Sequence, residues 1–396
     1  MFASTSNSRI SKLASLRQVH QAFHWLHLHE PQLRKWQLEM IAIPAPPFGE
    51  QARAVWFCDR FTELGLTNVH IDAEGNALAE LNTTGNPDSP VVLLSAHLDT
   101  VFPAGTDCTP TEDGAKILAP GASDNAAGLT ALLGIAAALL TSSLRTTIAI
   151  LFTANCGEEA HGNLRGMRHL FTQSPYKNRI KAAIALEGHG TSPIITHALG
   201  SRRFKLTLTG PGGHSWADAS NPNPINELAQ VITALAALNL PVDPRTTLNI
   251  GLIHGGTAIN AIPESATCEL DLRSTDANQL RQTEQQVLQI VTGTLLNSTL
   301  RLNLELTGDR PAAALPSNSP LLQTIKSVDR HLSIRTEPRI GSTDANIPLF
   351  MGIPAIAIAA GGTGGNIHTL REWYDPTNRA LALRRILLIL LDTCST

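Results

Sequence analysis

Acidic and imidazole side chains recur in one context along this sequence, just after an apolar stretch or at the start of the helix that follows one. They are His97, Asp99, Asp124, Glu158, Glu159, Glu187 and His368. Such groups bind divalent cations and serve as general bases. Taken singly, each has a simpler explanation, because Asp124 could cap a helix and His97 could be a hydrogen-bonded core histidine. Gathered in one place, they would form a negative cluster that requires a cation.

The charge of such a cluster matches two divalent ions. Asp124, Glu159 and Glu187 contribute −3 and a bridging hydroxide contributes −1, which together balance +4. Two metal ions about 3.5–4 Å apart can share a carboxylate and a hydroxide, lower the pKa of the bound water toward about 7 and polarise a carbonyl group. Imidazole and carboxylate ligands favour Zn²⁺, with Co²⁺ or Mn²⁺ as substitutes. The sequence therefore predicts two divalent metal ions.

Two further positions are expected to support the ligands. Asp99 lies two residues after His97 and can accept the second N–H of that imidazole, which would fix its tautomer. Glu158 and Glu159 are adjacent, so their side chains are expected to point apart. One of the two can bind metal while the other remains available as the general base.

The scaffold that must position these groups is predicted to be an α/β domain. Short apolar runs alternate with Ala- and Leu-rich helices, which indicates a mostly parallel sheet that is covered on both faces. In such sheets, ligands bind beyond the carboxyl ends of the strands, where the candidate residues lie. The predicted strands span residues 76–81, 91–95, 146–154, 181–186 and 353–359, and the predicted helices span 13–29, 30–43, 50–64 and 125–140.

A second pattern interrupts the first between residues 201 and 310. Residues 203–209 and 266–274 alternate between apolar and polar side chains, as half-exposed antiparallel strands do, and helices are expected near 226–238 and 276–295. We therefore predict a discontinuous catalytic domain of residues 1–200 and 311–396. A smaller α+β domain of residues 201–310 is predicted to be inserted into it.

Composition excludes several other classes of protein. The 396 residues carry a net charge of −3 and contain 10 Phe, 5 Trp and 2 Tyr, which argues against a nucleic-acid partner. No apolar stretch approaches the roughly 18 residues of a membrane span, and the polar N-terminus lacks a signal core. The 5 cysteines are scattered without a CxxC pair, as in proteins of a reducing compartment, so a cytoplasmic location is expected.

Six motifs occur in a fixed order along the chain. They read SAHLDTVFP (95–103), GASDNAAG (121–128), NCGEEAHG (155–162), ALEGHG (185–190), GPGGHSW (210–216) and GGNIHTLREW (364–373). Together they resemble the M20 family of co-catalytic metallopeptidases and amidohydrolases from about residue 35 onward. That family includes glutamate carboxypeptidases, tripeptidases, succinyl-diaminopimelate desuccinylases, acetylornithine deacetylases and aminoacylases. The resemblance implies a homodimer in which the inserted domain is both lid and dimerisation domain.

The resemblance also implies a role for each residue of the metal site. One metal ion would be bound by His97 and Glu187, the other by Glu159 and His368, and Asp124 would bridge them. Asp99 would orient His97, Glu158 would be the general base, and the Asp124–Asn125 peptide bond would be cis.

Further roles are implied in the lid and near the C-terminus. His214 resembles the histidine that the partner subunit supplies to stabilise a developing oxyanion, although a turn histidine beside two glycines is the local alternative. Arg273 equally fits a solvated strand arginine, but a guanidinium suits a substrate carboxylate well. The substrate-binding positions implied by the resemblance are Asn260, Arg273, Arg310, Gly361 and Gly362.

The expected activity is hydrolysis of an amide bond in a small peptide or N-acyl amino acid that bears a free carboxylate. In the family, a glutamate at the position of Glu187 tends to accompany carboxypeptidases and deacylases. An aminopeptidase or tripeptidase is the alternative within the class, and a non-catalytic dimerising scaffold is the alternative outside it. Cys156 is not expected to be a nucleophile, because neighbouring carboxylates should raise the pKa of its thiol.

Overall fold

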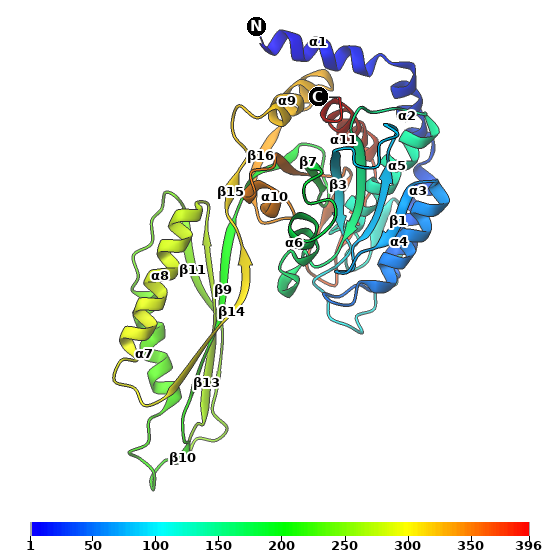
Figure 1. Ribbon diagram of the computed structural model, residues 1–396. Coiled ribbons are helices and arrows are strands. Elements are labelled where there is room, and N and C mark those ends of the chain that lie inside the picture. The colour runs from blue at the N-terminus through cyan, green and yellow to red at the C-terminus, as the bar shows by residue number, and fades with distance from the viewer. Residues whose placement is uncertain (1, 396) are drawn as a thin grey trace. The chain divides into compact units, whose positions relative to one another are not determined.

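The computed structural model of the protein describes residues 2–395, which form two compact units. The first unit comprises residues 2–197 and 314–395, and the second unit is Ala198–Ala313 (Figure 1). Among residues 2–395, no helix combines the length and the apolar content that crossing a bilayer requires.

The first unit is built on a nine-stranded mixed sheet with the order β1-β2-β6-β3-β7-β17-β8-β15, in which β16 also pairs with β8. The central strands β6, β3, β7 and β17 run parallel, while β1, β2 and β8 pair antiparallel toward the edges. The predicted α/β class with a mostly parallel sheet is therefore confirmed. The strands span Thr67–Ile71 (β1), Ala77–Leu81 (β2), Val91–His97 (β3), Ala149–Asn155 (β6), Ile180–Leu186 (β7), Pro193–Ala198 (β8), Ala313–Ala314 (β15), Glu337–Gly341 (β16) and Ala355–Ile358 (β17).

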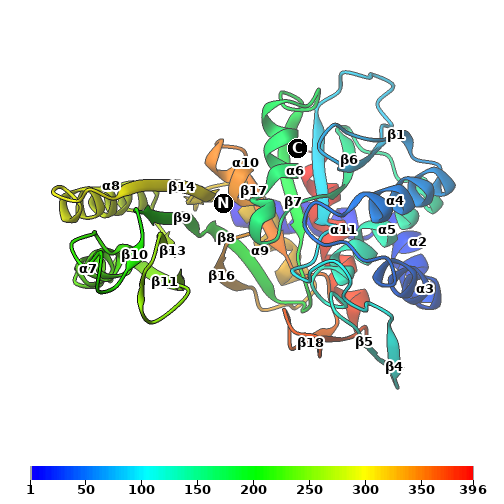
Figure 2. The same ribbon diagram turned by 90° about the horizontal axis from the view of Figure 1, so that it is seen from below.

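Helices cover both faces of this sheet, which explains why its central strands are apolar throughout. Every residue of β3 and β6 is buried. The chain moves across the sheet in one direction from β3 to β6, through α5, and in the other direction from β6 to β7, through α6. Because both crossovers are right-handed, α5 and α6 lie on opposite faces of the sheet. Figure 2 shows α6 and α10 on one side of the sheet and α4, α5 and α11 on the other. These helices span Gln51–Leu64 (α4), Ala126–Thr141 (α5), Arg165–Thr172 (α6), Asn346–Phe350 (α10) and Arg379–Thr393 (α11).

The N-terminal segment differs from its predicted single helix over residues 13–29. It forms α1 (Phe2–Ala14) and α2 (Arg17–Leu28), because Leu16 adopts an extended conformation with ψ 136°. The hydroxyl of Ser15 donates to the carbonyl of Lys12 at 2.8 Å, a local bond that competes with helical continuation. Helix α3 (Glu30–Ile41) follows directly, and α1 packs against α9 (Pro320–His331) and α11.

The second unit is a four-stranded antiparallel sheet with the order β11-β13-β9-β14. Helices α7 (Pro224–Ala236) and α8 (Ala277–Thr294) pack on it around a core that includes Leu206, Leu270 and Val287. The strands β11 and β14 were not predicted, although residues 301–306 alternate between polar and apolar side chains. The strands span Gly200–Thr209 (β9), Thr246–Gly255 (β11), Ser265–Ser274 (β13) and Arg301–Arg310 (β14).

Candidate active site

The candidate residues of the first unit meet beyond the carboxyl ends of its parallel strands. His97 is the last residue of β3, Glu187 follows β7 directly, and Asp124 lies two residues before α5. His368 comes from the loop between β18 (Thr363–Gly365) and β19 (Trp373–Asp375). Within residues 2–395, three groups of side chains have ligand atoms within 4.8 Å of one another: His97, Asp124 and Glu187; His97, Glu158 and Glu159; and Asp124, Glu159 and His368.

The carboxylate of Asp124 lies between the two histidines. Its Oδ1 is 3.1 Å from Nε2 of His97, and its Oδ2 is 3.2 Å from Nε2 of His368. The same nitrogens lie 3.5 Å from Glu187 and 3.2 Å from Glu159, respectively. Ligand atoms bound tetrahedrally at about 2.0–2.1 Å from a metal ion stand roughly 3.4 Å apart. The spacing and chemistry of these donors therefore fit two divalent ions that share Asp124.

Protons bind strongly to this cluster in the metal-free protein. Hydrogen bonds to Asp124 and Glu159 raise the pKa of His368 to about 10. Burial disfavours a charged His97, but the charge of Glu187 and hydrogen bonds to nearby carboxylates outweigh it and raise the pKa well above 6.5. Burial raises the pKa of Glu187 to about 7, against the attraction of His97. The same negative potential that holds these protons would hold cations.

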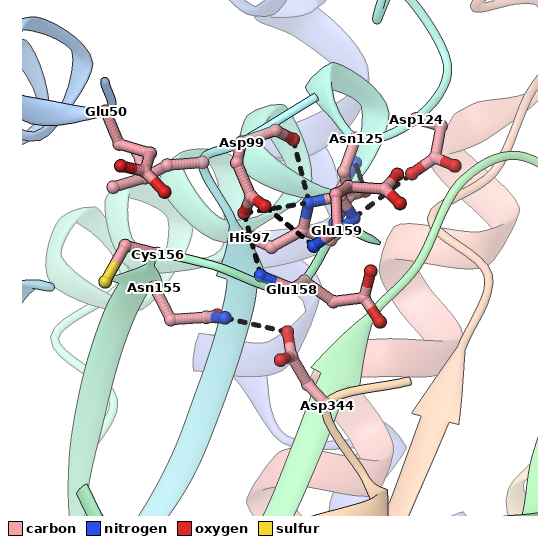
Figure 3. A network of polar contacts seen from close by, with 12 residues as sticks. Glu50, His97, Asp99, Asp124, Asn125, Asn155, Cys156, Glu158, Glu159 and Asp344 are labelled. Atoms are coloured by element: carbon pink, nitrogen blue, oxygen red, sulfur yellow. Dashed lines mark hydrogen bonds and ion pairs between the residues drawn. The ribbon is translucent and has the colours of Figure 1, made fainter. Parts of the chain in front are cut away.

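Asp99 supports the site in two ways. Its backbone carbonyl lies 3.0 Å from Nδ1 of His97, while its carboxylate is farther from that nitrogen, at 3.7 Å. Donation by Nδ1–H would leave Nε2 free to bind metal. The carboxylate accepts the backbone N–H of Glu158 at 3.0 Å and that of Glu159 at 2.7 Å. Asp99 thus links the imidazole to the loop that carries both glutamates, as Figure 3 shows.

Asn125 joins the start of α5 to the end of β7. The Asp124–Asn125 peptide bond is cis, as the resemblance implied. The Asn125 amide donates to the carbonyl of Leu186 at 2.8 Å and accepts the N–H groups of Gly128 and Gly188, each at 3.1 Å. A Cβ on Gly128 would lie 2.2 Å from the Asn125 oxygen, so this position requires glycine. These contacts bring Asp124 and Glu187 together.

Two buried acids near the site were missed by the sequence analysis. Glu372 is 1% exposed and accepts three backbone N–H groups of the loop that carries Asp124. Burial raises the pKa of Glu372 to about 7. Asp344, also 1% exposed, accepts the amide of Asn155 at 2.9 Å, and Figure 3 shows it beside the loop of Glu158. Glu372 belongs to the motif that contains His368, a signal that was available; we find no comparable local signal for Asp344.

A cavity of about 160 Å³ opens beside Asp124 and Glu187. Its wall is largely apolar and includes Ile194, Ile195 and Ile358. Arg339 also lines it, with a half-exposed side chain that forms an ion pair with a glutamate on the same strand at 3.0 Å. The cavity thus combines an apolar wall with one cationic group.

Gly361 and Gly362 follow β17, and close packing against the neighbouring backbone explains why both positions are glycine. Both have positive φ, 97° and 68°. A Cβ on Gly361 would lie 2.7 Å from the backbone of Arg379, and a Cβ on Gly362 would lie 2.4 Å from the carbonyl of Asp375. The N–H of Gly361 donates to the carbonyl of Gly190 at 2.7 Å. Close backbone packing therefore requires both glycines whatever they contact in a substrate.

His214 and Asn260 lie in the second unit, on and beside a short two-stranded sheet of β10 (Gly213–His214) and β12 (Ala261–Ile262). Both are exposed. Nδ1 of His214 accepts the backbone N–H of Trp216 at 3.1 Å, so the proton is assigned to Nε2. The carbonyl of Asn260 accepts the N–H of Ser215 at 3.0 Å, which joins the two segments.

Arginines gather on one face of the sheet in the second unit. Arg273 on β13 and Arg310 on β14 are both registered opposite Ser201 on β9, so the three side chains share a face. Arg203, two residues further along β9, joins them, and it shares the carboxylate of Asp271 with Arg273 at 3.5 and 2.7 Å. Burial and then the charge of Arg310 lower the pKa of Arg203. Arg203 was not predicted, although the alternation of its strand could have placed it on this face.

The thiol of Cys156 does not take part in the chemistry of the site. Cys156 is fully buried, and burial raises the pKa of its thiol. Its sulfur lies 3.3 Å from the carbonyl of Glu74 and 3.4 Å from the side chain of Asn76. A protonated, enclosed thiol is a structural group rather than a nucleophile.

Comparisons with known proteins cover both units. The family profile described as peptidase dimerisation domain, of the M20 type, matches residues 196–299, and the profile of peptidase family M28 matches residues 76–209. A succinyl-diaminopimelate desuccinylase from Corynebacterium glutamicum is 27% identical over 340 residues, which cover 81% of this chain and 86% of that protein.

Solved structures share the fold of this chain. A tripeptidase from Staphylococcus aureus has a TM-score of 0.75 at 22% identity, covering 92% of this chain and 98% of its own. A dinuclear metal-binding peptidase of the M20 family from Bacillus subtilis has a TM-score of 0.68 at 15% identity, covering 92% and 98%.

Proposed function

We propose that this chain, which belongs to the M20 family of metal-dependent hydrolases, cleaves amide bonds in small peptides or N-acyl amino acids that bear a free carboxylate. As a member of that family, it is a hydrolase that acts on amide bonds. The observation that carries the more specific proposal is the placement of the Asp124 carboxylate between two imidazole nitrogens, each of which also faces a glutamate.

Two divalent ions are proposed as the cofactors. His97, Asp124 and Glu187 would hold one ion, and Asp124, Glu159 and His368 the other. The donor set favours Zn²⁺, with Co²⁺ or Mn²⁺ as substitutes. When bound, such a pair supplies an acidified water and polarises the amide carbonyl.

Glu158 is proposed as the general base. The two adjacent glutamates do not point apart as expected from their spacing, because a carboxylate oxygen of each lies within 4.8 Å of the other and of His97 (Figure 3). Both can therefore reach the metal cluster, and the resemblance is what assigns the base to Glu158. Glu158 is 6% exposed, and Asp99 holds its backbone at 3.0 Å. In this position its carboxylate would take a proton from the attacking water and deliver it to the nitrogen of the leaving amine.

The second unit is proposed to recognise the substrate carboxylate. Arg203, Arg273 and Arg310 form a cationic face, and guanidinium groups bind carboxylates in a bidentate manner. The cavity beside Glu187 would take an apolar part of the substrate, and Arg339 at its wall would favour a side group with negative charge. The relative from C. glutamicum carries the name of a desuccinylase, which agrees with an acyl group of this kind.

A homodimer formed through the second unit is part of the proposal. The match to a peptidase dimerisation domain over residues 196–299 supports it. In that assembly, His214 would enter the active site of the partner subunit and stabilise the developing oxyanion, and Asn260 would contact substrate. A cytoplasmic location remains a prediction from the cysteine pattern.

The test is metal analysis of the purified protein together with a matched substrate panel. N-acyl amino acids and dipeptides would be compared with the same compounds blocked as C-terminal amides, and with tripeptides and amino-terminal chromogenic amides. We expect two bound divalent ions, and a kcat/KM at least tenfold higher for the free carboxylates. Cleavage of the amino-terminal amides alone would favour the aminopeptidase alternative and refute carboxylate recognition.

A further inference from the structure

The loop that carries Asp124 is held by a single buried carboxylate. Oε1 of Glu372 accepts the backbone N–H of Ser123 and of Asp124, and Oε2 accepts that of Gly121, each at 2.8 Å. The backbone carbonyl of Glu372 accepts a fourth N–H, from Ala119, at 3.1 Å. Three backbone N–H groups directed at one carboxyl group favour its ionised form. Both ends of Glu372 thus bind the segment from residue 119 to residue 124.

Glu372 lies on the same turn as a candidate metal ligand. His368 precedes it by four residues, and the N–H of Glu372 donates to the carbonyl of Thr369 at 3.1 Å within that turn. Nε2 of His368 lies 3.2 Å from Oδ2 of Asp124. The turn therefore supplies one ligand through His368 and holds the backbone of the shared ligand through Glu372.

Contacts on the other side of the loop use neutral groups. The hydroxyl of Ser123 lies 2.9 Å from Nδ1 of His189, and Asn125 bonds to the end of β7. Among residues 2–395, Glu372 does not belong to any of the three groups of clustered ligand atoms. Its carboxylate acts on the backbone of Asp124, and the Asp124 carboxylate faces the two histidines.

We propose that Glu372 is a positioning residue, which sets the geometry of the shared metal ligand Asp124 and thereby the affinity of the site for divalent ions. This inference rests on the proposed function. The physical reason is that a bridging carboxylate must present its two oxygens in two directions at once, so its backbone must be fixed more closely than that of a ligand to one ion. Groups that orient metal ligands typically change metal affinity about 10–100-fold when they are altered.

The decisive variant is Glu372→Gln. It keeps the size of the side chain but replaces one accepting oxygen by an NH₂ group, which would face a backbone N–H of the loop. A role limited to the fold would lower thermal stability without a specific loss of metal binding. The positioning role predicts a weaker and differently coordinated metal pair.

Asp72 offers a matched control for the loss of such hydrogen bonds. One oxygen of its carboxylate accepts the N–H groups of Glu74, Gly75 and Asn76, each at 3.0 Å. Asp72 resembles Glu372 in being a largely buried carboxylate, 8% exposed, that binds the backbone of a loop. Unlike the loop of Asp124, however, this loop carries none of the clustered ligand atoms. Asp72→Asn should lower thermal stability and leave metal affinity unchanged.

The experiment is a Co²⁺ titration of the metal-free, full-length protein, followed by calorimetry and by the visible spectrum, with thermal unfolding of each metal-free variant. We expect Glu372→Gln to bind Co²⁺ about 10–100-fold more weakly than wild type, with a changed spectrum, while Asp72→Asn keeps wild-type affinity and spectrum. If the glutamine variant does not fold, Glu372→Asp is titrated instead, because it keeps the charge but shortens the reach.

Two results would overturn this inference but leave the proposed function intact. One is wild-type affinity and spectrum in the Glu372 variant, and the other is an equal loss of affinity in Asp72→Asn. A wild-type protein that binds no divalent ion would instead refute the proposed function itself, before any variant is compared.

Discussion

Metal binding should release protons, and the metal-free structure indicates which groups lose them. The histidine nitrogens that face the carboxylates must lose their protons before they can bind a metal ion. With a pKa of about 10, His368 is fully protonated at pH 7. Against burial, the charge of Glu187 and hydrogen bonds to carboxylates also raise the pKa of His97 well above 6.5. Burial raises the pKa of Glu187 to about 7.

At least about one proton, that of His368, should therefore be released per chain at pH 7, and His97 and Glu187 should add to it. The sign follows directly, because protons compete with the ions for the same atoms. Affinity for the pair of ions should therefore rise with pH, by at least about tenfold per pH unit near pH 7, and fall as the solution becomes acidic.

Calorimetric titration of the metal-free protein with Zn²⁺ would measure this number, when repeated in buffers of different ionisation enthalpy. His368→Ala should lower the release by about one proton, because the charged group is gone. A release well below one proton in the wild type would refute this account of the metal-free cluster. So would a His368→Ala variant that released as many protons as wild type.

Four more outcomes are expected. Glu158→Gln should keep two metal ions by elemental analysis but lower kcat by about 10²–10⁴-fold, as loss of a general base does, and wild-type kcat would exclude that role. His214→Ala should be inactive with metal ions retained, and mixing it with Glu158→Gln should restore some activity through hybrid sites if subunits exchange. Arg339→Ala should raise KM for an N-succinyl amino acid more than for its N-butyryl analogue, and an equal rise in both would count against a charged subsite. Burial alone would raise the pKa of Glu80, but the hydrogen bond from Tyr176 outweighs it and lowers that pKa below 4.5. The ionised Glu80 therefore stabilises the folded protein fully above pH 4.5, and this contribution is lost as the pH falls through the lowered pKa. Urea unfolding of Glu80→Gln should show a loss of stability at pH 7 that shrinks toward pH 3, and a constant difference would contradict this.

Much of the first unit could be predicted from local sequence. Continuous apolar runs predicted its buried central strands, and His97 and Glu187 stand directly at the ends of two of them. Because parallel strands present their carboxyl ends at one edge, this placement alone brings the two side chains together. The resemblance to known motifs then distinguished Glu158 from Glu159, which adjacency in sequence could not do.

The tertiary structure decided which atoms of the predicted residues are used. The sequence predicted Asp99 as a partner of His97, and its carboxylate lies 3.7 Å from Nδ1 of His97. The nearer contact, at 3.0 Å, comes from the Asp99 backbone carbonyl, and the carboxylate also accepts the N–H groups of Glu158 and Glu159. That choice depends on where the loop after β6 passes β3. A sequence pattern specifies residue types and spacing but not the path of a loop.

The sequence by itself determined three features of this protein: the types of metal-ligating side chain, the apolar patterns of the strands and the insertion of an antiparallel segment into the α/β domain. Only the folded chain decided the contacts among residues far apart, such as the bond from Gly121 to Glu372 across 251 positions and the gathering of Arg203 with Arg273 and Arg310. The physical reason is that periodicity follows from the backbone of each element alone. Contacts between elements instead depend on packing, strand register and loop paths, which the whole chain settles together.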